Sequence, residues 1–488
     1  MKSNASRLLF RNAFHLGLGQ VATTALGILL TATIGRALGP SDFGTLYIIW
    51  TIVSFVALIV DWGQTAYITR EMAKGRLDES ELIGSALLVR LTATLAACGI
   101  AVATAFAMGY DQHIVLLALL AVVVMLPATI YAPFGYTLRG KDRMDIDVYA
   151  TIAGKLVLLV ATFAALRLGG GPMEVILMQA AAGLATLLVG GYLALQLGLK
   201  AKAPTATAVR ELFFQGAPIV LFALVVASQS LGEMLILSAF AGSTVVGWYG
   251  ASRTVFGIAI SPAMVALNAA FPEFSRASLS TVHMRHIVEL TGRIIFITAA
   301  AVSPALYVFA DHIIGIIYGY GHFEDAPSVL RAMAVFIPLS FFVLLLGTAM
   351  TAVGQNKELL AIGVVRIVAC LTASWMLMDF WQQRFGNGAI LLVIVAGLSE
   401  MPAAVASIAL LPRGSVSSAT ILNLLRACVT AVCAALPLSV LQPFALWYQV
   451  PLFVFLLAAA ALATQLVSRG DLRLALDFAR SRIVAIRP

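Results

Sequence analysis

The chain has few charged residues for its length. Of its 488 residues, 11% are charged and 61% are hydrophobic, whereas a soluble domain has roughly 25% charged and 45–50% apolar residues. A water-soluble protein of this size has no core large enough to hide so much apolar surface. The composition therefore excludes a soluble globular protein and predicts that lipid covers much of the chain.

Cysteine is scarce too. All four cysteines lie within apolar stretches, and they show neither the spacing of a zinc site nor that of a redox pair (Cys98, Cys370, Cys428 and Cys433). We interpret them as small apolar packing residues. The sequence therefore predicts no disulfide framework.

The residue groups that perform catalysis or hold a cofactor are missing from the sequence. Gly140-Lys141-Asp142 lacks the preceding glycine loop of a nucleotide-binding site. His283 and His286 have no third metal ligand near them in the sequence, and no nucleophile–base grouping is present. We therefore expect a protein that is not an enzyme and that uses neither a cofactor nor a metal site.

The net charge of +8 does not indicate a nucleic-acid partner. The basic residues are scattered between hydrophobic runs, and they form neither a basic domain nor a patch interleaved with aromatic residues. We expect the lipid bilayer, and no nucleic acid, as the surrounding partner.

Long apolar runs are what the sequence does contain. A helix needs roughly 20 apolar residues to cross the hydrocarbon core of a bilayer. Fourteen such runs are present, at 13–35, 44–68, 82–108, 114–138, 148–168, 173–197, 213–239, 246–271, 287–310, 327–352, 359–381, 388–410, 419–441 and 449–467. The fold class predicted is an all-α polytopic membrane protein with about 14 transmembrane helices.

Lysine and arginine are divided unevenly between the two sides of these spans. The N-terminus and every second connection hold 21 of them, whereas the opposite connections hold three, at Arg36, Arg167 and Arg384. Basic residues collect on the cytoplasmic side of membrane proteins. We therefore predict that both termini are cytoplasmic, which requires an even number of spans.

Two short motifs recur in the second half of the chain. The motif at 39–44 (GPSDFG) is matched at 242–247 (GSTVVG), and the motif at 137–143 is matched at 351–357. The offsets are 203 and 214 residues, as expected of two diverged halves. Duplicated halves are a common plan of transporters.

The repeat and the apolar runs together predict five parts. These are an N-terminal six-helix lobe at 1–200, a cytoplasmic linker at 201–212, a second six-helix lobe at 213–412, helices 13 and 14 at 413–467, and a cytoplasmic tail at 468–488.

Several motifs also occur in an order that is typical of one family. They are Gly35-Arg-Ala-Leu-Gly-Pro-Ser-Asp-Phe-Gly-Thr-Leu-Tyr47, Asp61-Trp-Gly63, Gly247-Trp-Tyr249, Phe271-Pro-Glu-Phe274 and Gly347-Thr-Ala-Met-Thr-Ala-Val-Gly354. With them, the chain resembles bacterial polysaccharide exporters. These are lipid-linked oligosaccharide flippases of the multidrug/oligosaccharidyl-lipid/polysaccharide superfamily.

The resemblance implies two six-helix lobes around a central cavity, two further C-terminal helices and transport by alternating access. It also implies a bacterial cytoplasmic membrane as the location and an anionic polyprenyl-pyrophosphate-linked oligosaccharide as the substrate. A polysaccharide polymerase and glycosyltransferases are the partner proteins expected on this basis.

Two other functions stay open. The first is a cation-coupled multidrug exporter of the same superfamily, for which an acidic cavity and twelve spans are expected. The second is a non-transporting membrane scaffold for glycan assembly, which has no need of the polar stripes along the first and eighth spans.

Charged residues within the spans are the candidate site residues, because each costs roughly 2.5–3.5 kcal/mol to insert and therefore usually faces protein or a water-filled cavity. Bases outnumber acids among them, and guanidinium groups suit a pyrophosphate. The residues predicted to line the substrate pathway are Arg36, Asp61, Lys155, Glu233, Arg253 and Arg366. Those predicted as possible sites of cation coupling are Asp61, Glu233 and Glu400.

Structural roles for these residues remain alternatives. Glu233 and Arg253 lie on consecutive predicted spans, where an ion pair between them either pins two helices or lines the pathway. Arg36 either belongs to the pathway or anchors the outer interface. Asp61 precedes Trp62-Gly63, which also suits a helix cap or bend.

Snorkelling is the favoured interpretation for the bases in the inner parts of the spans. In that arrangement the apolar stem lies in the membrane and the charged end reaches the surface. The residues concerned are Arg90, Lys155, Arg293 and Arg426.

Overall fold

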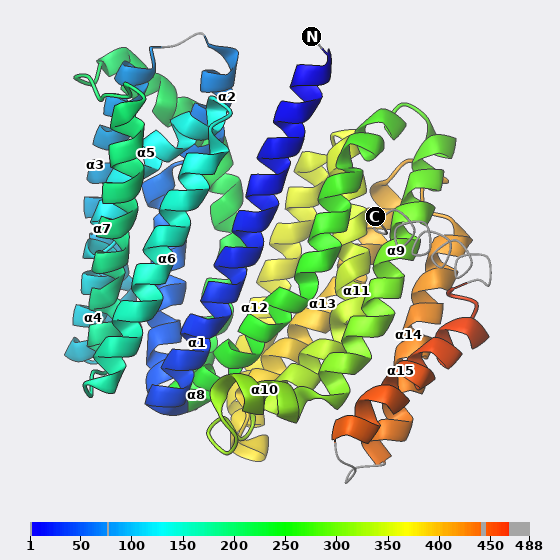
Figure 1. Ribbon diagram of the computed structural model, residues 1–488. Helices are drawn as coiled ribbons and strands as arrows, with labels where there is room; N and C mark the ends of the chain where they lie inside the picture. The colour runs from blue at the N-terminus through cyan, green and yellow to red at the C-terminus, as the bar shows by residue number, and fades with distance from the viewer. Residues whose placement is uncertain (1, 76–77, 441–445, 468–488) are drawn as a thin grey trace, which may run out of the picture. The chain divides into compact units, whose positions relative to one another are not determined.

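The computed structural model describes residues 2–75, 78–440 and 446–467, and the regular elements in this part of the chain are all α-helices (Figure 1). The first seven are α1 (Lys2–Asp61), α2 (Gln64–Lys74), α3 (Glu79–Ala107), α4 (Gln112–Val123), α5 (Leu126–Gly140), α6 (Met144–Arg167) and α7 (Pro172–Gln196). The remainder are α8 (Ala206–Ala277), α9 (Thr281–Val308), α10 (Ala310–Tyr318), α11 (Ala326–Val353), α12 (Asn356–Phe385), α13 (Gly388–Leu410), α14 (Ser418–Val440) and α15 (Leu446–Ala463). The predicted tail at 468–488 lies outside the described residues.

The helices confirm the predicted fold class. Within the described residues, 11 helical stretches are long and apolar enough to cross a membrane, and two of them have 56 and 72 residues. Each of these two is long enough for two crossings of roughly 20 residues each. Counted as two crossings apiece, and with the shorter apolar helix Trp447–Ala463 as a further one, the stretches give about 14 spans.

The two longest helices bend at equivalent glycines. Gly39 interrupts α1 with φ 76° and ψ 180°, and Gly242 interrupts α8 with φ 74° and ψ 172°. A positive φ of this size with an extended ψ is accessible to glycine at little steric cost. The motif repeat predicted at an offset of 203 residues therefore has the same backbone conformation in both halves.

The second repeated motif lies at the C-terminal end of a helix in both halves. Helix α5 ends at Gly140, and α11 ends at Val353, where Gly354 adopts the left-handed conformation with φ 84°. Glycine is the usual residue after a helix in this conformation. The motif thus marks the end of the fourth predicted span in each half.

The chain forms two compact units, and each is described by itself. Unit one runs through Gly250 and takes in Ile317–Phe323 and Gln382–Gly386. Unit two holds the remainder, and α8 continues from the first unit into the second. The first arm of α8 therefore belongs to unit one, and the lobe boundaries at 200 and 213 stay a prediction.

Unit one contains two apolar clusters. The first forms around Tyr67 and Ile68 of α2, which pack with Leu82 and Ala86 of α3. The second joins α3 and α5 to the end of α7 through Ile83, Leu138, Ile146, Ala194 and Leu199. Burying such side chains in a membrane protein gains packing contacts more than it removes surface from water.

Unit two is built around α9 and α11, which have the largest fully buried apolar faces described there, including Ile295, Phe296 and Phe341. A smaller cluster joins α9 to α14 and α15 through Val308, Ala434 and Phe453. Helices α9, α11, α13, α14 and α15 each contain an internal proline. Spanning helices tolerate such prolines when neighbouring groups satisfy the freed backbone.

Candidate functional site

Asp61 is the last residue of α1, at a sharp bend that leads into α2. Trp62 and Gly63 both have positive φ, 47° and 72°. The Asp61 carboxylate accepts a hydrogen bond from the Thr65 hydroxyl (3.0 Å) and one from the Thr65 backbone amide (3.4 Å). The Asp61 carboxylate therefore binds a residue in the first turn of α2, across this bend.

The same carboxylate is also the centre of a partly buried polar cluster. Arg90 of α3 donates from Nη1 to Asp61 Oδ1 at 2.9 Å, and the Tyr136 hydroxyl of α5 donates to the same oxygen at 2.8 Å. The Arg90 guanidinium also lies over the Tyr136 ring, 5.6 Å from its centroid. The cluster thus ties the end of α1 to α3 and α5.

The prediction that Arg90 snorkels to the surface is wrong. Its side chain is 8% exposed and forms an ion pair with Asp61. A paired and hydrogen-bonded charge is much less costly within a membrane than an isolated one. The distant partners Asp61 and Tyr136 offset the cost of burial, and nothing in the sequence around Arg90 identifies them.

Lys155 does not snorkel either. Its ammonium donates to the backbone carbonyl of Thr23 at 3.2 Å, near the middle of the first predicted span. Lys155 is half-buried and joins α6 to α1 through this bond. The structure therefore places this predicted pathway residue against the part of α1 that precedes the kink.

One buried acid of unit one was not predicted as a site residue. Asp147 of α6 accepts hydrogen bonds from Arg139 Nε (2.6 Å) and from the Tyr131 hydroxyl (3.3 Å). Asp147 and Arg139 are close in sequence and flank a short turn, where charges usually face water. The local sequence does not indicate that Asp147 is buried, because its burial depends on the packing of Tyr131 against the turn.

Arg36 and Glu233 lie near the two kinks. Arg36 is exposed just before Gly39, and its Nε donates to the Ile317 carbonyl at 3.0 Å. Glu233 is 3% exposed and precedes the kink at Gly242. It accepts hydrogen bonds at 2.8 Å from Gln229 and from the Tyr249 hydroxyl, which lies beyond the kink.

The two arms of the α8 kink are thus joined by Glu233 and Tyr249. The partner predicted for Glu233 was Arg253. The Arg253 guanidinium lies over the Phe256 ring, 5.5 Å from its centroid, within unit two. The ion pair between Glu233 and Arg253 stays a prediction.

The two kinks contact each other reciprocally within unit one. A Cβ atom added to Gly44 would lie 1.8 Å from the Ser243 carbonyl oxygen, and one added to Gly247 would lie 2.0 Å from the Pro40 carbonyl oxygen. The positions 40 and 243, and likewise 44 and 247, differ by the repeat offset of 203. The backbones therefore meet as in a two-fold symmetric interface.

Beside this contact the hydroxyls of Ser41 and Ser243 are 2.9 Å apart. The rings of Tyr47 and Tyr249 meet edge to face, with 6.2 Å between centroids. Because side chains longer than hydrogen do not fit at Gly44 or Gly247, both glycines are required for this approach.

In unit two, Glu400 of α13 accepts a hydrogen bond from the Ser340 hydroxyl of α11 at 2.8 Å. Arg366 of α12 is half-buried. An ion pair not identified in the sequence joins Arg331 of α11 to Asp311 of α10.

The three acids predicted for cation coupling lie on different helices and have different partners. Asp61 pairs with an arginine, Glu233 accepts from a phenol and an amide, and Glu400 accepts from a serine. No group of three or more histidine, cysteine or acidic side chains that could hold a metal ion is found among the described residues.

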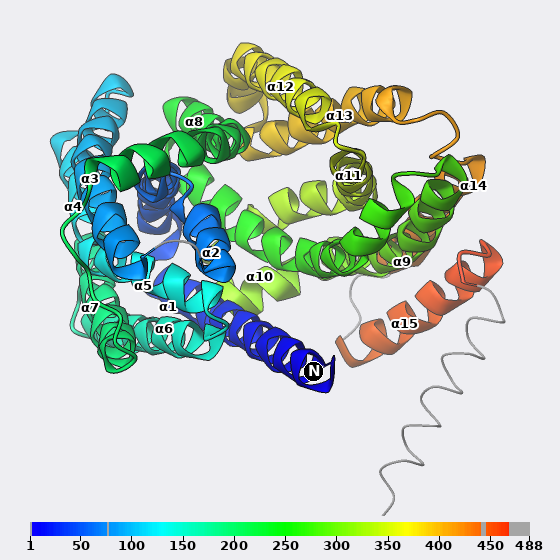
Figure 2. The same ribbon diagram turned by 90° about the horizontal axis from the view of Figure 1, so that it is seen from above.

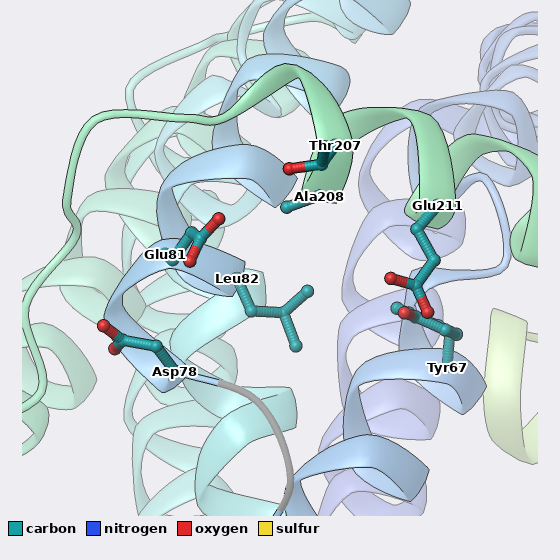
Figure 3. Close-up of a pocket in the computed structure, with 7 residues that line it drawn as sticks. All are labelled: Tyr67, Asp78, Glu81, Leu82, Thr207, Ala208 and Glu211. Atoms are coloured by element: carbon teal, nitrogen blue, oxygen red, sulfur yellow. The ribbon is translucent and has the colours of Figure 1, made fainter.

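A polar pocket of about 150 Å³ lies where the first turns of α8, which follow the segment 197–205, meet α2 and α3 (Figure 3). Asp78, Glu81 and Glu211 line it, and Figure 3 shows the Tyr67 hydroxyl directed toward the Glu211 carboxylate. The segment is fastened to α3, because Lys202 donates from its backbone amide to the Ser80 carbonyl at 2.9 Å.

Lys202 also forms an ion pair with Asp78, at 2.5 Å between Nζ and Oδ2. Its ammonium, hydrogen-bonded to the carboxylate, lowers the pKa of Asp78, and the carboxylate raises the pKa of Lys202. The pocket at the end of unit one is therefore lined by acidic residues that Lys202 partly neutralises, and it adds no further charge within the membrane.

Comparisons with solved structures identify the fold. The lipid II flippase MurJ in an inward closed conformation matches with a TM-score of 0.70 at 11% identity, over 91% of this chain and 98% of that one. An inward-facing multidrug resistance MATE family transporter of the MOP superfamily matches with a TM-score of 0.64 at 17% identity, over 78% and 92%. A MOP superfamily transporter from Pyrococcus furiosus gives 0.57 at 15% identity, over 82% and 93%.

Comparison with curated proteins gives no match. The model of the family described as "Polysaccharide biosynthesis protein" matches residues 9–278, more than half of the chain. This segment includes both kinks, the Asp61 cluster and Glu233. The fold is shared with the lipid II flippase MurJ and with a MATE family transporter, and the chain belongs to the polysaccharide biosynthesis protein family.

Proposed function

We propose that this protein is a flippase, which moves a polyprenyl-pyrophosphate-linked oligosaccharide across the cytoplasmic membrane for the synthesis of a surface polysaccharide. The observation that carries the proposal is the family match over residues 9–278 in a chain that spans the membrane many times. The fold shared with the lipid II flippase MurJ supports a lipid-linked substrate.

Alternating access is the mechanism that we propose for this movement. The pyrophosphate binds first from the inner leaflet and is released to the outer leaflet, while the polyprenyl chain stays in lipid. Cytoplasmic termini, a bacterial inner membrane and nearby glycosyltransferases and polymerase belong to the same proposal, supported by the division of lysine and arginine between the connections.

The basic residues within the spans supply the charge that a pyrophosphate needs. Arg36, Arg253 and Arg366 carry guanidinium groups, which bind phosphate oxygens with two parallel hydrogen bonds. We assign Arg253 to the pyrophosphate, because it lies on α8 four residues after Tyr249, a direct partner of Glu233. Lys155, bound to the Thr23 carbonyl, keeps a supporting position beside α1.

The proposal is tested in vesicles that contain the purified full chain and a fluorescent polyprenyl-pyrophosphate oligosaccharide. A membrane-impermeant reductant bleaches only the outer leaflet, so flipping increases the fraction of fluorescence that is lost. We expect this increase with the wild-type chain and not in vesicles without protein. Vesicles with correctly inserted wild-type protein that behave like empty ones would show that the protein is not a flippase for this lipid.

Substitution of Arg253 tests its assignment. Arg253→Ala is expected to abolish flipping, and the matched control Arg384→Ala, an exposed arginine at the end of α12, is expected to flip normally. Both variants must insert to the level of the wild type. Normal flipping by Arg253→Ala would contradict the role of that residue and leave the flippase proposal in place.

A cation-coupled multidrug exporter is the second candidate, favoured by the fold shared with a multidrug resistance MATE family transporter. In that case Asp61, Glu233 or Glu400 would couple the cation. The same vesicles distinguish the two candidates, because an exporter releases a preloaded fluorescent organic cation when a proton or sodium gradient is applied and does not move the lipid.

A further inference from the structure

Helices α12 and α13 flank a groove of about 840 Å³ that lies wholly within unit two. Both ribbon views place the two helices side by side (Figures 1 and 2). Sites for small organic ligands have volumes of roughly 300–1,000 Å³. The groove is therefore large enough for a substantial length of hydrocarbon chain.

Short side chains on both walls produce the groove. Those on α12 recur at steps of four residues and those on α13 at a step of three, so each set lies on one helix face. The alanines concerned are Ala361, Ala369, Ala373, Ala403 and Ala406. A pair of spanning helices with these residues in contact would pack closely, whereas here the space between the two faces is left open.

The rim of the groove is apolar and exposed. Val365 of α12 is 69% exposed, Leu377 of α12 is 47% exposed, and Leu398 of α13 is 49% exposed. In a helix of this hydropathy, exposed apolar side chains face hydrocarbon. A chain that enters the groove from the bilayer therefore exchanges one apolar surrounding for another, and loses no contact with water.

Arg366 is the single charged residue among those that line the groove, all of which the structure describes. It lies ten residues after the start of α12 at Asn356, which corresponds to about 15 Å along the helix. Ser399 of α13 also lines the groove. A guanidinium and a hydroxyl in an otherwise apolar groove suit a ligand with a phosphate and a long apolar chain.

The depth of Arg366 decides which lipid fits. The phosphate of an ordinary bilayer lipid remains at the interface, outside a hydrocarbon core about 30 Å thick. A lipid whose head group is carried across the membrane must bring its phosphate to the depth of Arg366. The position of this arginine therefore favours the transported lipid over the surrounding phospholipids.

We propose that the groove between α12 and α13 binds the polyprenyl chain of the transported lipid, and that Arg366 binds its pyrophosphate as it passes. This inference rests on the proposed function and adds a specific site for the lipid part of the substrate. It also explains why a transporter for a sugar chain has a lipid-facing groove with a single basic residue.

Photolabelling of the full chain in nanodiscs tests the site. The probe is a polyprenyl pyrophosphate with a diazirine in its chain, and the labelled peptides are identified by mass spectrometry. We expect labels on the groove faces of α12 and α13. Unlabelled polyprenyl pyrophosphate should compete, whereas polyprenol, which lacks the phosphates, and phosphatidylglycerol should not.

Two substitutions test the two parts of the groove. Ala369→Trp fills the groove and should reduce labelling by about tenfold. Val368→Trp is the control, because Val368 is 59% exposed and does not line the groove. It should leave labelling unchanged. Arg366→Gln should weaken competition by the pyrophosphate about tenfold, as expected for loss of a charged hydrogen bond. Arg384→Gln is its matched control.

Uniform labelling of all exposed helices would overturn the groove site, and so would equal competition by phosphatidylglycerol. Unchanged labelling of well-folded Ala369→Trp would do the same. These measurements need no transport, so they separate the two proposals. Groove labelling in a chain that fails to flip lipid in vesicles would contradict the proposed function and support the site.

Discussion

Helix α1 kinks at Gly39 and helix α8 kinks at Gly242 with almost the same backbone angles, but the two helices hold their buried acids differently. The carboxylate of Asp61, at the end of α1, pairs with the Arg90 guanidinium. The carboxylate of Glu233, before the kink in α8, accepts hydrogen bonds from two uncharged groups. The two halves thus share the backbone conformation at the kink, whereas the partners of their acids differ.

This difference indicates different tasks. The Asp61 carboxylate is the counter-charge of the buried Arg90, so its loss would leave a buried charge without compensation. The partners of Glu233 are a phenol and an amide, and neither carries a charge that the acid must balance. Among the acids of unit one that were predicted to couple a cation, Glu233 is therefore the better candidate, and Asp61 is assigned to holding α1, α3 and α5 together.

The largest effect expected is the loss of stability on neutralising Asp61. Asp61→Asn leaves the buried Arg90 without its carboxylate and should destabilise the protein by about 3–5 kcal/mol, the usual cost of breaking a buried ion pair. Thermal unfolding of the purified protein in detergent measures this loss. The double variant Asp61→Asn, Arg90→Leu should recover part of it, because no uncompensated charge remains.

The contrast between Asp61 and Glu233 fails if their substitutions change the stability of the protein equally. Glu233→Gln replaces the carboxylate with an amide that can still accept from Tyr249, so its effect on unfolding should be much smaller than that of Asp61→Asn. An Asp61→Asn variant as stable as Glu233→Gln would show that the Arg90 pair does not hold the three helices together.

The reciprocal contact between the two kinks predicts the second-largest effect. Gly44→Ala and Gly247→Ala each place a methyl group against a carbonyl oxygen of the other kink, so the backbones must separate. Overpacking of this kind costs about 1–3 kcal/mol. The loss should be similar for the two variants, as measured by thermal unfolding, because the contacts are related by the repeat.

Gly27→Ala is the matched control, since a Cβ atom at Gly27 of α1 would have nothing within 4 Å. Its stability should equal that of the wild type or exceed it slightly, as alanine favours helix. A loss for Gly44→Ala without one for Gly247→Ala would contradict the reciprocal contact.

The span positions and the repeated glycine motif were accessible from the sequence because each depends on local signals. Apolar runs give the spans, and the glycine motif at 39–44 recurs at 242–247. The partners of the buried charges were not accessible in this way. Asp61 and Tyr136 are 75 residues apart, and the packing of α3 against both α1 and α5 brings them together.

The snorkelling predictions for Arg90 and Lys155 show the same limit. Hydropathy gives the depth of a residue along its helix but not the neighbour that it meets there. Arg90 meets a carboxylate, and Lys155 meets the backbone carbonyl of Thr23 in α1. The groove between α12 and α13 likewise cannot be predicted from a single run of apolar residues, because it forms between the faces of two helices.

A smaller effect is expected from removing the Tyr249 hydroxyl. Tyr249→Phe takes away one hydrogen bond to Glu233 and should cost about 1–2 kcal/mol, because the acceptor is a buried carboxylate. Thermal unfolding of the purified protein in detergent measures this loss.

Tyr47→Phe controls for the loss of a phenol. Tyr47 packs edge to face on Tyr249. Equal losses of stability for Tyr249→Phe and Tyr47→Phe would show that the hydrogen bond from Tyr249 to Glu233 does not stabilise the kink in α8.

The smallest effect concerns an exposed ion pair, Lys202–Asp78, which fastens the segment before α8 to the start of α3. Lys202 lowers the pKa of Asp78, so the pair stabilises the fold above the ordinary pKa of an aspartate and loses this contribution as the pH falls through the lowered value. The pKa of Lys202 is raised, and its contribution is lost only as the pH rises through that higher value.

Asp78→Asn should therefore differ from the wild type at neutral pH and approach it in acid, with a shift in melting temperature much smaller than that for Asp61→Asn. Exposed pairs are screened by water and salt, whereas the Asp61–Arg90 pair is not. Raising the salt concentration should remove the Asp78 effect and leave the Asp61 effect. If salt removed both, the Arg90 pair would be as accessible to water as the Lys202 pair, and the contrast between the buried acid of α1 and the surface acid of α3 would fail.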